Sequence, residues 1–168
     1  LRDKTDQAAA WYIGAPDDED AHAFALLLDL TSPSPEHDAA AQDALAWFAH
    51  SAMPQQNPSP VAALALGLFD VLHLPMPDAA HTVAATLEGT PFDGRKPASD
   101  DLRKLADAAS QPARKGEALL RVLDIVGPTG PAGLSPDVTV ECVRTLQQLG
   151  LTKEARALAI EALASARP

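Results

Sequence analysis

Residues 135–163 read SPDVTVECVRTLQQLGLTKEARALAIEAL and contain two runs in which apolar residues recur at helical spacing. The first run begins at Ser135-Pro136-Asp137 and places on one face Val138, Cys142, Val143, Leu146 and Leu149. Gly150 ends it, and behind a capping Thr152 the second run carries Ala155, Leu158, Ala159, Ala162 and Leu163. Two amphipathic helices joined by so short a turn pack antiparallel, so this stretch predicts a helical hairpin.

The rest of the chain repeats this alternation of apolar helical runs with proline or glycine breaks. The 168 residues include 34 Ala and 23 Leu but only 8 Val and 3 Ile, a composition that favours helices over strands. Comparable helix starts recur after 36 residues, from Ser99 to Ser135, and after 40 residues, from Pro112 to Thr152. We therefore predict an all-α fold of about nine short antiparallel helices stacked as helical hairpins, in the manner of an α-solenoid.

A chain of this length suits one domain, and we expect a single helical domain over residues 1–168. The loop at 89–98 is where it would subdivide. Because the chain begins with Leu1 in a polar, helix-compatible segment, we expect it to be a piece of a longer, bacterial protein. No run of 18 apolar residues occurs, which predicts a soluble domain without membrane insertion and leaves cytoplasm and periplasm both open.

The charge of the chain is unevenly distributed. Its formal net charge is −10, and no Lys or Arg occurs between Lys4 and Arg95, whereas all five histidines do. This balance argues against nucleic-acid and anionic-membrane partners, which need clustered basic residues. The acidic N-terminal half is either a solvated face or a docking surface for a basic protein or peptide, and its histidines raise the hypothesis of pH sensitivity.

One acidic segment could bear a site. Carboxylates beside a histidine can hold a divalent cation, and here they are Asp17, Asp18, Glu19, Asp20 and His22. Consecutive helical residues fan around the axis, however, and acidic residues cap and stabilise helix starts. We therefore expect Asp17 to cap a helix with the following acids in its first turn, and we assign no metal ligand.

Aromatic residues are concentrated in the same half, where six of the seven precede residue 70. They are interpreted first as core anchors. Alternatively, Trp11, Tyr12 and Trp47 line a groove whose acidic rim selects a cationic or sugar-like ligand. The candidate partner or ligand surface therefore comprises Trp11, Tyr12, Asp17, Asp18, Glu19, Asp20, His22 and Trp47.

Catalytic patterns are missing from the sequence. The only cysteine, Cys142, lies on an apolar helical face and is expected to be a core residue. Asp100 and Asp101 follow Ser99 and fit a capped helix start better than an acid–base pair. Pro128 and Pro131 remove backbone donors that a phosphate-binding glycine loop would need. We predict no enzyme activity, no metal and no cofactor.

The C-terminal segment resembles the second half of a tetratricopeptide-type hairpin. A Leu149-Gly150 turn precedes Glu154-Ala155, small residues follow four and seven positions later at Ala159 and Ala162, and Pro168 closes the segment. The resemblance implies an α-solenoid that binds proteins or peptides on a concave face, with no catalytic residues to transfer. We predict a non-catalytic protein-interaction or scaffold module. The alternative is a small-ligand-binding domain that uses the aromatic, acidic half.

Overall fold

Eight α-helices and one short 3₁₀ turn make up the described part of the computed structural model, which covers residues 18–52, 58–87, 90 and 92–166. They are α2 (Glu19–Thr31), α3 (Pro35–Ala52), α4 (Pro60–Val71), α5 (Asp78–Leu87), α6 (Ser99–Ala109), η1 (Pro112–Arg114), α7 (Lys115–Val126), α8 (Pro136–Gln148) and α9 (Thr152–Ser165). These residues contain no β-strand, which confirms the all-α prediction. The sequence also predicts a first helix that ends at Ile13 before Gly14, and that segment lies outside the described residues.

The helices begin and end at the capping residues and breakers of the sequence, with small shifts. Asp18, one residue later than predicted, caps α2 by accepting from the Ala21 amide at 2.9 Å. Ser99 and Thr152 are the first residues of α6 and α9 and make no side-chain cap, so both cap predictions were wrong by one position. Gly127 ends α7 with a φ of +68°, a conformation in which a Cβ is strained.

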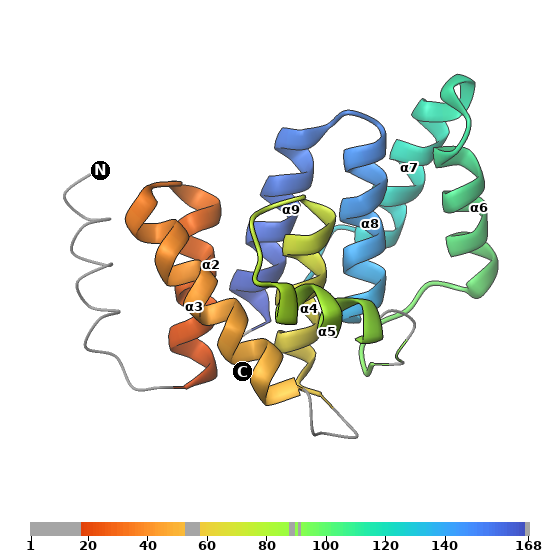
Figure 1. The fold of residues 1–168 in the computed structure, drawn as a ribbon. Helices are drawn as coiled ribbons and strands as arrows, with labels where there is room; N and C mark the ends of the chain where they lie inside the picture. Colours follow the sequence, from red (N-terminus) through yellow and green to blue (C-terminus); the bar gives the residue numbers. More distant parts are fainter. Residues whose placement is uncertain (1–17, 53–57, 88–89, 91, 167–168) are drawn as a thin grey trace.

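Consecutive helices pack as four pairs, α2 with α3, α4 with α5, α6 with α7 and α8 with α9 (Figure 1). The order of the pairs in space differs from their order in the chain. The α8–α9 pair lies in the middle, because α8 packs against α4 on one side and α7 on the other, while α9 packs against α2. The pair closest to the chain's C-terminal end therefore joins the two sides of the molecule.

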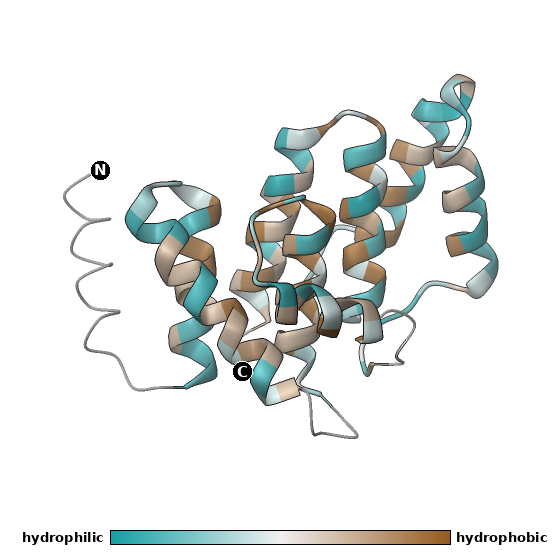
Figure 2. Cartoon of the chain, viewed as in Figure 1, coloured by the Kyte–Doolittle hydropathy of each residue, from teal (hydrophilic) through white to brown (hydrophobic). Residues whose placement is uncertain are grey.

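The helices bury a main apolar core that runs from α2 to α9, and a smaller cluster of Ala108, Ala118 and Leu149 lies beside it. In Figure 2 each helix carries both hydrophobic (brown) and hydrophilic (teal) residues, as expected of helices that bury one face. The face predicted for α8 is buried throughout, and Cys142 is fully enclosed there. On α7 the apolar spacing of the sequence predicts a buried face of Leu119, Val122, Leu123 and Val126, which is partly wrong. Val122 is buried together with Ala118 and Ile125, whereas Leu123 is 59% exposed, because α7 contacts its neighbours along a narrow stripe.

Arg95 attaches the loop between α5 and α6 to the end of α7 and the loop that follows it. Its guanidinium donates to the carbonyl oxygens of Ile125 (2.8 Å), Val126 (2.9 Å) and Gly130 (3.2 Å). The first two are carbonyls at the end of α7, where a positive charge also complements the helix dipole, and the third lies in the loop that follows. None of the helices in the described ranges is long and apolar enough to cross a membrane.

Candidate functional site

The acidic residues predicted as a surface at the start of α2 are partly used to hold helices together. Asp18 caps α2, and the Glu19 carboxylate accepts a hydrogen bond from the Ser59 hydroxyl. Ser59 in turn caps α4 by accepting from the Val61 amide at 3.1 Å. Asp20 is exposed. The segment therefore links the starts of α2 and α4, which is a structural role for two of its carboxylates.

His22 and Trp47, which the sequence analysis placed in one candidate surface, do lie together. Their ring centroids are 4.4 Å apart with planes inclined by 24°, and Phe48 meets both rings edge-on. His22 is buried and Trp47 half-buried, so one face of the indole is used in the contact between α2 and α3. Trp11, Tyr12 and Asp17 lie outside the described residues.

Residues that can hold a metal ion do not gather in the described ranges, where no group of three or more His, Cys, Asp or Glu side chains is suitably placed. Burial raises the pKa of the Cys142 thiol to about 12, so this thiol is not a thiolate near neutral pH. The prediction that Cys142 is a core residue is confirmed.

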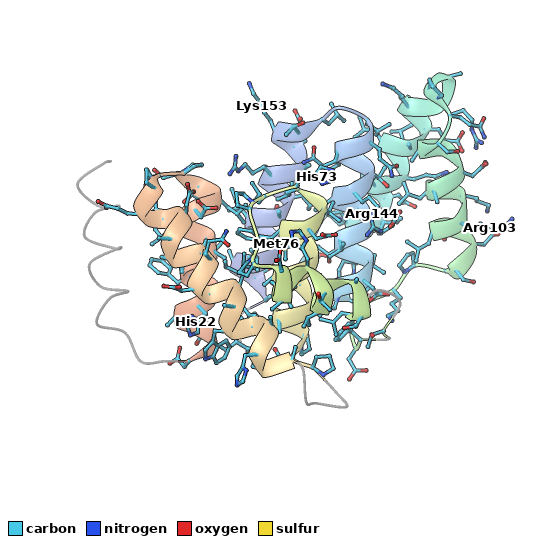
Figure 3. All side chains as sticks on the ribbon, viewed as in Figure 1. His22, His73, Met76, Arg103, Arg144 and Lys153 are labelled. Atoms are coloured by element: carbon cyan, nitrogen blue, oxygen red, sulfur yellow. The ribbon has the colours of Figure 1, made fainter. Side chains whose placement is uncertain are left out.

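A cavity of about 320 Å³ opens between α4, α5 and α8, with α6 and the preceding loop at its edge. We call it the α4/α8 pocket. Its apolar lining comprises Ala63, Gly67, Ala84, Ala85, Leu87, Phe92, Leu102, Pro136 and Val140. Its polar and charged lining comprises Asp70, His81, Asp137, Glu141 and Arg144. In Figure 3, Arg144, which lines the pocket, lies on α8, whereas His22 of the predicted surface lies on α2 in another part of the molecule.

Small residues on α4 create the floor of this pocket. Gly67 lies in the middle of α4, where glycine costs about 1 kcal/mol relative to alanine. A Cβ at this position would lie 2.8 Å from Cγ2 of Val140 on α8. The missing side chain therefore allows close approach of α4 and α8.

The charged side chains around the pocket are arranged in pairs. Nδ1 of His81 lies 3.1 Å from the Asp70 carboxylate, and the Arg144 guanidinium lies 2.6 Å from Glu141. Asp137 binds Lys96, which lies outside the lining, at 3.5 Å through Oδ2. Its other oxygen, Oδ1, is buried and has no hydrogen-bond partner. One carboxylate oxygen at the pocket is thus left without a donor.

No pattern in the sequence indicates this pocket. Its charged residues come from α4, α5 and α8 and are far apart in the chain, so no motif announces them. Two local signals exist in retrospect. Gly67 interrupts an apolar helical run, and Asp137 and Glu141 recur at helical spacing on the face of α8 opposite its buried residues.

Comparisons with protein-family models, curated protein sequences and solved structures gave no match.

Proposed function

We propose that this chain is a non-catalytic protein-interaction module that takes a short segment of a partner protein into the α4/α8 pocket. The observation that carries the proposal is the pocket itself, an open cavity of about 320 Å³ with an apolar floor and charged side chains at its rim. An apolar floor supplies affinity through burial of surface, and polar groups at the edge supply orientation.

The construction of the pocket supports recognition. It lies between α4 and α5 on one side and α8 on the other, so its walls are helices already fixed by the common core. Such a preformed site loses little conformational freedom on binding. The resemblance of residues 149–168 to the tetratricopeptide hairpin points in the same direction, because α8, the helix before that segment, supplies one wall.

A small-ligand site is the second candidate function. A cavity of about 320 Å³ is at the lower end of the range, roughly 300–1,000 Å³, in which small-molecule sites fall. The predicted ligand site was on the aromatic N-terminal half, whereas the pocket uses α4, α5 and α8. A small ligand and a peptide side chain would make the same contacts inside the pocket. They differ because a peptide chain continues outside the pocket, whereas a small ligand ends within it.

The experiment is a selection of random 12-residue peptides displayed on phage against the immobilised chain. The blocking variant is Ala85→Phe, because Ala85 is exposed on α5 and lines the pocket. Ala79→Phe is its matched control, since Ala79 is exposed on the same helix and does not line the pocket. We expect peptides enriched on the wild-type chain and on Ala79→Phe to be lost on Ala85→Phe.

Equal enrichment on all three proteins would overturn the assignment of the pocket, and no enrichment on the wild type would overturn peptide binding. The second candidate has its own readout. A library of small fragments would then shift the amide resonances of Gly67 and Val140, and Ala85→Phe would suppress those shifts.

A further inference from the structure

The pocket has an excess of negative charge over an apolar floor. Three carboxylates line it, from Asp70, Asp137 and Glu141, against one guanidinium, from Arg144. That guanidinium is held by Glu141 at 2.6 Å. His81 lies against Asp70, so the carboxylate without a cation inside the pocket is that of Asp137.

The Asp137 carboxylate is incompletely satisfied. Lys96 reaches Oδ2 from outside the lining at 3.5 Å, a long contact between partly exposed side chains. Oδ1 is buried without a donor. Because Oδ1 is closed to solvent, a ligand in the pocket would reach this carboxylate at Oδ2, which can accept a second donor beside the long contact with Lys96. Because the acceptor is charged, a cationic donor is favoured over a neutral one.

The apolar floor restricts the ligand further. Ala63, Gly67 and Val140 offer no hydrogen-bonding side chain to a ligand, so the part that crosses them must be apolar. Lysine and arginine side chains have this construction, an aliphatic stem that packs on apolar surface and a charged end that seeks polar partners.

Resting on the proposed function, we infer that the α4/α8 pocket takes a lysine or arginine side chain of the partner, flanked by apolar residues, with Asp137 receiving its cationic end. The net charge of −10 attracts such a segment before contact. The acidic N-terminal half predicted a basic partner. In this proposal the groups that bind it are the carboxylate of Asp70 on α4 and those of Asp137 and Glu141 on α8.

The test uses four peptides of the form acetyl-Ala-Leu-X-Leu-Ala-amide, in which X is lysine, arginine, norleucine or glutamate. Norleucine keeps the aliphatic stem of lysine and removes the ammonium group. Binding to the ¹⁵N-labelled chain is followed through the amide resonances of Gly67 and Val140. We expect the lysine or arginine peptide to bind about tenfold more tightly than the norleucine peptide, and the glutamate peptide to bind least.

Asp137→Asn identifies the receiving group. It should weaken the preferred cationic peptide by about tenfold and leave the norleucine peptide unchanged. Asp124→Asn is the control, because Asp124 is exposed on α7 and does not line the pocket. Thermal melting followed by circular dichroism verifies that each variant is folded.

The outcomes separate the two proposals. If the norleucine or glutamate peptide binds as well as the cationic peptides at the pocket amides, peptide binding stands and cation selection is overturned. If Asp137→Asn binds every peptide like the wild type, the role of Asp137 is overturned. Phage selection could give pocket-dependent peptides while none of the four test peptides shifts the pocket amides at millimolar concentration. In that case cation selection alone is overturned. If both experiments fail, the proposed function is overturned as well.

Discussion

The His22 imidazole lies against the Trp47 indole with ring centroids 4.4 Å apart, which fixes the first turns of α2 to the end of α3. His22→Ala should lower the free energy of unfolding by about 1–3 kcal/mol, through the lost stack and the space left behind. Urea denaturation measures the change. His50→Ala, at an exposed position of α3, should stay within about 0.5 kcal/mol of wild type. Equal losses in both variants would contradict a specific role for the stack.

Gly67 faces Val140 across the contact between α4 and α8. Gly67→Ala gains helix propensity but places a Cβ 2.8 Å from Val140 Cγ2, so we expect a net loss of about 1–2 kcal/mol. Adding Val140→Ala to that variant should recover part of the loss, in a double-mutant cycle measured by urea denaturation.

Gly116 supplies the matched control for Gly67→Ala. It lies in α7, and a Cβ there meets no atom within 4 Å. Gly116→Ala should therefore stabilise the chain by about 0.5–1 kcal/mol. If Gly67→Ala stabilises by a similar amount, the close approach of α4 and α8 does not depend on glycine.

Arg95 holds the end of α7 and the loop after it through three carbonyl oxygens. Arg95→Met should cost about 1–3 kcal/mol, because these acceptors lose a charged donor. Arg95→Lys should recover only part of this, since an ammonium group lacks the fork that reaches several acceptors. In thermal melts Arg103→Met should have little effect, because Arg103 is 77% exposed and pairs on the surface of α6.

Asp29 makes stability depend on pH. Burial raises the pKa of Asp29 to about 6. A side-chain hydrogen bond with Asp38 and the negative charge of Asp38 also raise this pKa, whereas electrostatic interactions with Arg156 and His37 lower it. Because this pKa is raised on folding, its contribution to stability is full below about pH 4 and is lost as pH rises through about 6. Asp29→Asn should therefore be more stable than wild type at pH 8, by at most about 3 kcal/mol.

Urea denaturation at pH 4.5 and pH 8 checks the prediction for Asp29. The difference between Asp29→Asn and wild type should shrink at the lower pH. Asp43→Asn, at an exposed position of α3, should show the same difference from wild type at both values. A constant difference for Asp29→Asn would refute the raised pKa.

The helices could be predicted from the sequence because their signals are local. Ser59-Pro60 and Gly127 mark helix ends, and the apolar spacing of α8 identifies its buried face. The face of α7 could not be predicted as well, because burial there depends on which neighbours it meets. Leu120 and Leu123 have the spacing of core residues and are exposed, since α7 packs only through the stripe next to them.

The pocket was beyond prediction for a related reason. His81 and Arg144 line the same pocket only because α5 packs on α4 and α4 packs on α8, and α4 and α8 are distant in the chain. Local patterns do not specify that pairing. The acidic segment around Asp18 attracted attention because its charges are adjacent in sequence, yet Asp18 and Glu19 are engaged in joining helix starts.

The central position of α8 also sets an order of events during synthesis. α4 is rich in alanine and leucine that are buried in the folded chain, and its main partner α8 begins only at Pro136. While the ribosome adds the intervening residues, that face of α4 lacks its partner. Unpaired apolar helices in partly synthesised chains are the surfaces that chaperones bind and through which nascent chains aggregate. The growing chain is therefore vulnerable at α4 until α8 emerges.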